Sequence, residues 1–253
     1  MTVEAIVLTY NEERNIADCL RCLLWADGLT VVDQGSTDRT AALAQSLGAR
    51  VISHPFESFA AQRNLALGRA WADWAFFVDA DERCTPELAR EIRSALGKGK
   101  AGWWVPRQNF IFGRLTRGAG WWPDYQLRLL RTGKASYDPR RPVHEVVVLD
   151  GEAGHLEHPL IHYNYHSMAQ FLRKQWRYSC LEARAILAAG ETAKARSLIG
   201  RPVREFWRRF VSLKGYEDGV HGFWLSILMA SYSFVVQARV VTATSGRRPQ
   251  LAL

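Results

Sequence analysis

Short apolar runs alternate with amphipathic segments through the first hundred residues. The apolar runs predict buried strands at 3–9, 29–33, 49–53 and 74–78. Between them, apolar residues at helical spacing predict helices at 12–25, 37–47 and 62–72. A further helix is expected from Pro86, because Thr85 is a good N-cap and proline suits the first helical position. This alternation is typical of a parallel, Rossmann-like sheet flanked by helices.

The pattern changes after residue 101. Short runs with aromatic residues predict strands that extend the sheet as a mixed or antiparallel portion, at 103–105, 126–130, 146–149 and 160–165. From Met168 onward the apolar spacing is helical. We expect a break at 200–202, where glycine and proline occur, and a last helix over 222–241.

These elements predict an α/β protein with a helical appendage. The sheet and its helices are expected to form a domain over 1–166, in two halves over 1–100 and 101–166. A helical C-terminal region over 167–241 and a flexible tail over 242–253 follow. With 253 residues, 48% of them hydrophobic, the chain can bury a sizeable core and is not expected to be disordered.

Two acidic clusters follow two of the predicted strands. Asp33 begins a Gly-Ser-Thr turn after the second strand, and Asp79 and Asp81 come directly after the run at 74–78. Open α/β sheets bind ligands at the carboxyl ends of their strands. The first cluster suits a nucleotide, because a carboxylate can accept a hydrogen bond from a pyrimidine N–H. The second suits a divalent cation, Mg²⁺ or Mn²⁺, held against phosphates.

Each cluster also has a plainer interpretation. Asp33 can cap the helix that follows it, although Ser36 or Asp38 could already do so. Asp79 and Asp81 can be ordinary solvated acids of a loop. Charges at the end of an all-apolar strand cost free energy unless they are paired or coordinated, which favours the metal site.

Four ordered motifs resemble those of family 2 glycosyltransferases, which have the GT-A fold. They are VLTYNEE at 7–13, VDQGSTD at 32–38, QRN at 62–64 and DADE at 79–82. Two later motifs resemble a narrower branch that includes bacterial lipopolysaccharide core glucosyltransferases, namely GWWPDYQLRL at 120–129 and VHE at 143–145. The resemblance covers nearly the whole chain. Gln34 departs from it, because the family usually has a small residue there.

The resemblance implies a nucleotide-sugar donor, with a UDP-sugar favoured. It makes 1–166 the catalytic domain, with 1–100 as its nucleotide-binding half and 101–166 as its acceptor half. It places Thr9, Asn11 and Glu12 beside Asp33 in the pocket for base and ribose. The remaining donor contacts are expected from Ser36, Arg63 and Asp79. Arg63 can contact the diphosphate or the ribose, and its alternative is a solvated arginine on a helix surface. The metal ligands are expected to be Asp79 and Asp81.

An inverting sugar transfer also needs a base that takes the proton of the acceptor hydroxyl. Asp124 is the first candidate, because it follows Trp121-Trp122-Pro123, whose aromatic faces suit a sugar ring. Glu145 is the rival, in a short polar pair before an apolar strand. The neighbouring His144 can be a third metal or phosphate contact, or a structural histidine.

The other histidines and the cysteines predict no zinc site. His155, His158, His162 and His166 lie close in sequence, but proline interrupts any helix there and no cysteine or carboxylate completes a tetrahedral set. Cys19 and Cys22 form a C-x-x-C on a predicted helix without a second pair downstream, so buried thiols are expected.

The net charge of +8 is unevenly distributed. Residues 1–100 contain 11 basic and 14 acidic side chains, whereas residues 101–253 contain 22 and 11. From His166 through Lys214, with Lys214 included, there are 11 Lys or Arg against 3 Glu, beside Trp and Phe at helical spacing. This composition suits interfacial helices on an anionic membrane, and the alternative is a packed helical cap with solvated arginines. No nucleic-acid module is recognisable, so nucleic acid is not an expected partner.

We expect a cytoplasmic protein, peripheral on the inner face of the membrane. The N-terminus lacks the pattern of a signal peptide, and the longest apolar run, 223–236, is shorter than a spanning helix. The leading hypothesis is a metal-dependent, inverting hexosyltransferase that acts on a saccharide or lipid-linked acceptor in lipopolysaccharide core-like glycan synthesis. The alternatives are a nucleotidyltransferase with the same two-acid site and a non-enzymatic basic adaptor for membrane or nucleic acid.

Overall fold

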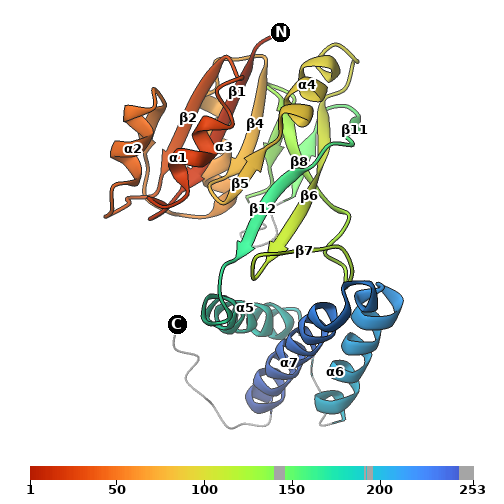
Figure 1. The fold of residues 1–253 in the computed structure, drawn as a ribbon. Helices are drawn as coiled ribbons and strands as arrows, with labels where there is room; N and C mark the ends of the chain where they lie inside the picture. The colour runs from red at the N-terminus through yellow and green to blue at the C-terminus, as the bar shows by residue number, and fades with distance from the viewer. Residues whose placement is uncertain (140–145, 191, 193–195, 245–253) are drawn as a thin grey trace. The chain divides into compact units, whose positions relative to one another are not determined.

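A ten-stranded mixed sheet forms the framework of the fold (Figure 1). Eight strands lie in the order β3-β2-β1-β4-β8-β6-β12-β5, and β7 and β11 each pair with β6. The bounds are β1 Val3–Thr9, β2 Gly28–Asp33, β3 Arg50–Ser53, β4 Trp74–Asp79, β5 Glu82–Cys84, β6 Gly102–Ile111, β7 Arg114–Thr116, β8 Asp124–Arg131, β11 Ala153–His155 and β12 Leu160–Tyr165. A separate antiparallel pair consists of β9 (Ala135–Tyr137) and β10 (Val147–Leu149).

The computed structural model describes residues 1–139, 146–190, 192 and 196–244. The chain divides into two units, each made of two stretches. The first unit comprises Met1–Arg107 and Asp124–His162, and the second comprises Gln108–Pro123 and Tyr163–Leu253. The predicted domain boundary after residue 166 stays a prediction.

Strands β3, β2, β1 and β4 are parallel, as the sequence predicts. All of β1 and all but the last residue of β4 are buried, which explains their uninterrupted apolar sequence. Their register pairs Thr9 with Asp33 and Leu8 with Asp79. The polar residues that end three neighbouring strands therefore meet at one edge of the sheet.

Helices cover both faces of the parallel strands (Figure 1). Their bounds are α1 Ile16–Arg21, α2 Thr40–Ser46, α3 Phe59–Arg69 and α4 Pro86–Ala95. Helices α1, α2 and α4 pack on the face that bears Phe76, whereas α3 and the β9-β10 pair pack on the face that bears Phe77. The predicted cap of α4 is confirmed, because Thr85 accepts a hydrogen bond from the Leu88 N–H at 3.2 Å.

The first helix is shorter than the predicted 12–25. Residues 13–15 form a turn instead, because backbone groups before the helix bond elsewhere. The Glu12 N–H donates to Oγ1 of Thr40, the first residue of α2, at 2.7 Å, and the Glu13 N–H donates to Asp38 Oδ2 in the β2–α2 loop at 3.2 Å. The two thiols of the C-x-x-C are free, and Cys19 is buried as expected. Cys22 is partly buried, and its Sγ accepts the N–H of Cys84 at 3.1 Å.

Antiparallel strands extend the sheet beyond β4. Strand β8 pairs with β4 through Phe76 and Leu129, and β6 pairs with β8 over most of its length. Strand β12 pairs with β5 through Ile161 and Arg83. These pairings bring side chains of β6, β8 and β12 alongside the acidic edge of the parallel strands.

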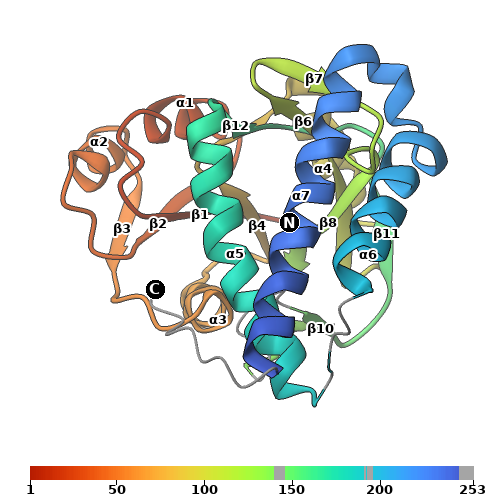
Figure 2. The same ribbon diagram turned by 90° about the horizontal axis from the view of Figure 1, so that it is seen from below.

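Three helices dominate the second unit: α5 (Met168–Ala188), α6 (Ser197–Trp207) and α7 (Gly219–Thr244). Figure 2 shows α7 between α5 and α6, and it packs against both. A small core joins α5 and α7 to the end of β6, around Phe171, Leu225 and Ile111. Gly222 lets α7 approach the preceding turn, because a Cβ there would lie 1.9 Å from the Gly215 carbonyl oxygen.

Two predictions for the C-terminal region are wrong. The break expected at 200–202 does not occur, because Pro202 lies inside α6, which continues into a π-helical segment over Arg208–Ser212. The apolar run at 223–236, predicted to be shorter than a spanning helix, lies within a longer helical stretch. Within the described chain, Gly215–Thr244 is one helix of 30 residues that is long and apolar enough to cross a membrane by length and composition alone.

Candidate active site

The carboxylate of Asp33 holds the turn that follows β2. The backbone N–H groups of Gly35 and Ser36 donate to its Oδ2 at 3.1 and 2.9 Å. Thr9 at the end of β1 donates its hydroxyl to Oδ1 at 3.2 Å, and the Ser36 hydroxyl donates to the same oxygen. Asp33 is therefore built into the loop as well as placed at the ligand-binding edge. Its contact with a nucleobase stays a prediction.

Asn11 fastens the β1–α1 loop to the same turn. Its backbone N–H donates to Ser36 Oγ at 2.9 Å, and its side-chain oxygen accepts the Thr37 N–H at 2.8 Å. Asn11 has a φ of 55°, a left-handed conformation that asparagine tolerates better than most residues. Glu12 is turned toward its own helix, where its Oε2 accepts from Asn15 at 2.7 Å. Four of the predicted donor residues thus lie together at the ends of β1 and β2.

Two arginines hold Asp79 at the end of β4. Arg128 of β8 donates from Nη1 to Oδ1 at 3.1 Å and also from Nη2 to Oδ2. Arg63 of α3 donates to Oδ1 at 3.3 Å and stacks on the Phe77 and Tyr137 rings. Arg63 and Arg128 are 7% and 5% exposed, so Arg63 is not the solvated surface arginine of the alternative interpretation.

The charges around Asp79 fix its protonation state. Burial alone would raise the pKa of this carboxyl, but the nearby Arg128 and Arg63 outweigh burial and hold the pKa well below its usual range. Asp79 and Glu82 in turn raise the pKa of Arg128 against its own burial. Asp79 and Arg128 are therefore both charged at neutral pH.

Glu82 links this network to Asp124. Its side chain is completely buried, and its Oε1 accepts from Arg128 at 2.9 Å and from Arg107 of β6 at 3.3 Å. Arg107 also donates from Nε and Nη2 to Asp124 Oδ2 at 2.9 and 2.6 Å. Asp124 is the first residue of β8, and its other oxygen accepts from Gln126 at 2.8 Å. One chain of ion pairs therefore connects Asp79, a predicted metal ligand, to Asp124, the first candidate for the base.

Asp81 stands apart from the arginines. Its Oδ2 lies 3.5 Å from Nε2 of His162 on β12, and about a quarter of its side chain is exposed, at 26%. Among the described residues no group of three or more His, Cys, Asp or Glu is arranged to hold a metal ion. A cation bound here would therefore take Asp81 together with phosphate oxygens and water. This donor set suits Mg²⁺, which proteins usually hold by one or two carboxylates plus substrate phosphates.

Two arginines that pair with the acids of the site were not predicted from the sequence. The sequence pattern predicts no role for Arg107, Arg128 or Glu82. It places His162 only in a cluster of histidines. A signal existed, since Arg128 interrupts an apolar strand at a position with the same facing as Asp124 and Gln126. Glu145 and His144 lie outside the described residues.

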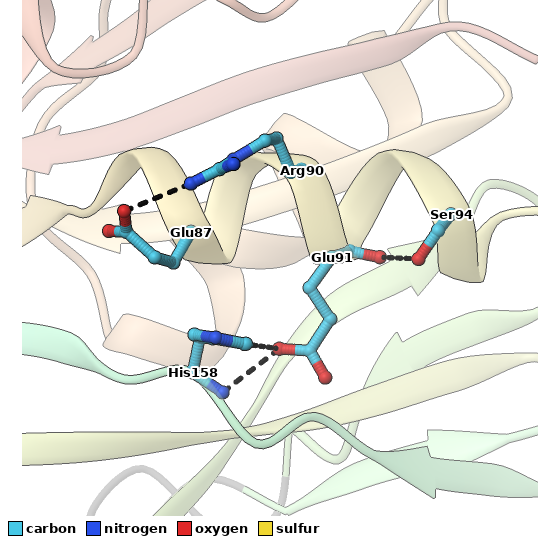
Figure 3. Close-up of a pocket in the computed structure, with 5 residues that line it drawn as sticks. All are labelled: Glu87, Arg90, Glu91, Ser94 and His158. Atoms are coloured by element: carbon cyan, nitrogen blue, oxygen red, sulfur yellow. Dashed lines mark hydrogen bonds and ion pairs between the residues drawn. The ribbon is translucent and has the colours of Figure 1, made fainter.

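The structure places two other predicted features elsewhere. Trp121, Trp122 and Pro123 belong to the second unit, whereas Asp124 belongs to the first. His158 contacts Glu91 of α4 rather than another histidine, with Nδ1 3.0 Å from Oε2. Figure 3 shows these two residues in a shallow pocket of about 400 Å³ along α4, which contains none of the predicted donor or metal residues.

Comparison with known proteins identifies the family. A model of glycosyl transferase family 2 matches residues 4–174. The lipopolysaccharide core biosynthesis glycosyltransferase LpsC of Rhizobium meliloti is 30% identical over 253 residues, covering 95% of this chain and 92% of that protein. An uncharacterized glycosyltransferase of Rickettsia conorii is 26% identical over 246 residues, covering 92% and 87%. The S. aureus TarS structure has 17% identity and a TM-score of 0.49, and covers 87% of this chain and 46% of that chain.

The chain belongs to glycosyltransferase family 2. It is a glycosyltransferase with a mixed, mainly parallel sheet flanked by helices and a long C-terminal helix, so the predicted fold class and enzyme class are confirmed. Membership of this family excludes the two alternative hypotheses, a nucleotidyltransferase and a non-enzymatic adaptor.

Proposed function

We propose that this enzyme transfers a hexose from a nucleotide-sugar, with a UDP-sugar favoured, to a saccharide or lipid-linked acceptor, with inversion at the sugar carbon and with a divalent cation. The observation that carries the proposal is the ion-pair chain from Asp79 through Arg128, Glu82 and Arg107 to Asp124. It ties a donor-side acid to a candidate base at the ligand-binding edge of the sheet. The relative named for lipopolysaccharide core biosynthesis supports a cell-envelope acceptor.

The donor contacts come from the ends of β1 and β2. Thr9, Asn11, Ser36 and Asp33 are already linked by hydrogen bonds, so they present a preformed surface to the base and ribose. Preformed contacts reduce the entropy lost on binding. Arg63, held over two aromatic rings, supplies positive charge beside this surface for the diphosphate.

Asp81 is the proposed protein ligand for Mg²⁺ or Mn²⁺. Its carboxylate is not paired with the arginines that occupy Asp79, which leaves its oxygens for a cation, with His162 alongside. When bound, the cation neutralises charge on the departing nucleoside diphosphate. Asp79 then acts mainly by fixing Arg128 and Arg63, and its direct contact with the cation remains part of the proposal.

Asp124 is the proposed base. Arg107 donates to its Oδ2 and Gln126 donates to its Oδ1. Both contacts stabilise the carboxylate form, which is the form that takes a proton from a sugar hydroxyl. Glu145 remains the rival for this role. The ion pair with Arg107 holds Asp124 in one orientation, which a positioned base requires.

The direct test is a panel of nucleotide-sugars incubated with the enzyme, with and without Mn²⁺. Release of the nucleoside diphosphate from one UDP-sugar, dependent on the cation and faster with a saccharide acceptor, is the expected result. Turnover that is unchanged by chelation would contradict the metal-dependent mechanism. The anomeric configuration of the product, read by NMR, decides between inversion and retention.

Asp124→Asn is expected to slow transfer by about 10²–10⁴-fold, because the amide cannot take the acceptor proton. Donor binding should be unchanged, since the base acts on the acceptor. Transfer rate and nucleotide affinity are measured on the same preparations, and Asp150→Asn, a change to an exposed acid that pairs with Lys134, is the matched control. If Glu145→Gln shows the loss and Asp124→Asn does not, the base is Glu145.

The place of action is proposed to be the cytoplasmic face of a membrane, with the enzyme attached peripherally. The basic, aromatic-rich helices of the second unit support this location, as does the envelope role of the named relative.

A further inference from the structure

The loop between β7 and β8 is held by the turn that precedes α7. Asp218 ends the short helix Gly215–Asp218, and its carboxylate accepts two consecutive backbone N–H groups of the loop. The Gly118 N–H donates to Oδ2 at 2.7 Å, and the Arg117 N–H donates to the same oxygen at 3.1 Å. Both groups come directly after β7, so one side chain replaces the hydrogen bonds that the sheet no longer provides.

The helical segment before this turn holds the loop at a second point. The Ala119 N–H donates to the Leu213 carbonyl at 2.8 Å, and Arg209 donates from Nη1 to the Ala119 carbonyl at 2.7 Å. Arg209 is itself fixed by Glu205, which accepts from its Nε at 2.6 Å. Residues between 205 and 218 therefore define the path of the loop.

The loop and the turn meet where two residues other than glycine have left-handed backbone. Ala119 has a φ of 55° and Lys214 a φ of 54°, which residues with a Cβ rarely adopt. Gly118 lies so close to this contact that a Cβ there would be 2.4 Å from the Lys214 carbonyl oxygen. Strained backbone of this kind persists only where the surroundings enforce it, and it is concentrated in loops that bind ligands. A loop that only joins two strands would not require it.

The two tryptophans of this loop have different surroundings. Trp121 packs against the small core of the second unit, with the Arg209 guanidinium 5.9 Å from its ring, and its carbonyl accepts from Asn109 at 2.9 Å. Trp122 is 37% exposed and shares none of these contacts. An exposed indole on a rigid backbone offers an apolar face and one N–H donor, which suit the C–H face and the hydroxyls of a sugar ring. Packing accounts for Trp121, whereas Trp122 presents its ring to solvent.

We propose that Trp122 contacts a sugar ring of the acceptor and that Asp218 is a positioning residue, which holds the loop so that this indole keeps one orientation. The assignment rests on the proposed function, which takes the acceptor to be a saccharide or to carry one. Binding to a fixed side chain costs less conformational entropy than binding to a mobile one. Loss of the Asp218 carboxylate should therefore weaken acceptor binding, although Asp218 itself does not contact the acceptor.

A looser loop should raise the KM for the acceptor and leave hydrolysis of the donor by water unchanged. The proposed base, Asp124, is oriented by Arg107 and Gln126, which lie outside the loop. Trp122→Ala and Asp218→Ala should each raise the KM for a saccharide acceptor by about tenfold, the loss expected for one aromatic contact, with kcat close to the wild-type value. Asp218→Asn keeps one oxygen that can accept both N–H groups, so it should restore most of the affinity.

Hydrogen exchange of the protein without ligands tests the anchoring alone. The Arg117 and Gly118 amides should exchange faster in Asp218→Ala than in the wild type, because they lose their acceptor. Exchange at the wild-type rate would show that Asp218 does not hold the loop. Glu217→Ala is the matched control, since it removes the neighbouring acid of the same turn, which is exposed and pairs with Lys214 at 3.3 Å. It should change neither the exchange of these amides nor the KM for the acceptor.

Steady-state kinetics test the link between the two residues. The donor is the UDP-sugar that the panel selects, and the acceptor is lipid-free core oligosaccharide released from lipopolysaccharide. If both residues serve one contact, Asp218→Ala should add little to the KM in a Trp122→Ala background. Independent effects would multiply to about 100-fold, and that result would overturn the positioning role of Asp218.

Two further outcomes separate this proposal from the proposed function. An unchanged acceptor KM in Trp122→Ala, or a wild type that hydrolyses the donor but transfers nothing to the oligosaccharide, would overturn the sugar contact of Trp122 alone. A wild type that cleaves no nucleotide-sugar would contradict the proposed function itself. Trp207→Ala, which removes another exposed indole of the second unit, should keep the wild-type KM.

Discussion

Replacing Arg128 with leucine is expected to lower the free energy of unfolding by about 3–5 kcal/mol. Arg128 is 5% exposed and donates to Asp79 and to the completely buried Glu82. Its removal leaves Asp79 with Arg63 alone and the buried Glu82 with Arg107 alone. Two acids with too little compensating charge are more costly than losing arginine and acids together. Denaturant unfolding at neutral pH measures the change.

The matched control is Arg131→Leu, on the same strand but exposed, which should change stability by no more than about 0.5 kcal/mol. In a Glu82→Gln background, Arg128→Leu should lower the free energy of unfolding by less, because the charge of Glu82 is then absent. A loss below about 1 kcal/mol for Arg128→Leu would show that the network is not a stabilising unit.

The effect of Arg128→Leu on the free energy of unfolding should depend on pH. The pKa of Asp79 is held below its usual range in the folded protein, so its pairing stabilises the fold above the unfolded-state pKa of about 3.9 and is lost as the pH falls. In the variant, Asp79 keeps only Arg63, and protonation of Asp79 at low pH removes the charge that has lost Arg128. The difference in stability between the wild type and Arg128→Leu should therefore narrow as the pH falls below about 4.

Asp81→Ala is expected to abolish turnover while the protein stays folded. A bound cation supplies several kcal/mol of transition-state stabilisation, which corresponds to at least about 10³-fold in rate. Asp81 contacts His162 at 3.5 Å and is partly exposed, so the loss of stability should stay within about 1 kcal/mol. Product formation, nucleotide binding with Mn²⁺ and thermal unfolding are measured together.

Asp150→Ala is the matched control for Asp81→Ala, since it removes an exposed acid whose partner is Lys134 on the surface. It should leave turnover and nucleotide binding unchanged. Near wild-type turnover of Asp81→Ala at saturating Mn²⁺ would show that Asp81 does not hold the cation.

The sequence predicts the acidic edge well because its signals are local. Asp33 and Asp79 each follow an apolar run directly, and parallel strands bring their carboxyl ends together whatever the exact register. The basic partners could not be placed in the same way. Arg128 reaches Asp79 only because β8 pairs antiparallel with β4. The two residues are 49 positions apart in the chain.

Local signals also misled at two places. Glycine and proline at 200–202 predict a helix end, but packing of α6 against α7 keeps the helix continuous through Pro202. Serines interrupt the apolar sequence of 223–236. The Ser226 hydroxyl donates to the Gly222 carbonyl at 2.7 Å, so its hydrogen bond is made within the helix. Uncharged polar residues therefore do not limit the length of α7.

Thermal unfolding of the wild type shows whether the acidic edge of the sheet binds a nucleotide through a cation. UDP and Mn²⁺ together should raise the midpoint by about 5–10 °C, the shift expected for ligand at some hundredfold above its dissociation constant. UDP alone and Mn²⁺ alone should each change it little. An equal rise with UDP in the presence of a chelator would show that binding does not need the cation. No rise with both ligands would show that the acidic edge does not bind this nucleotide.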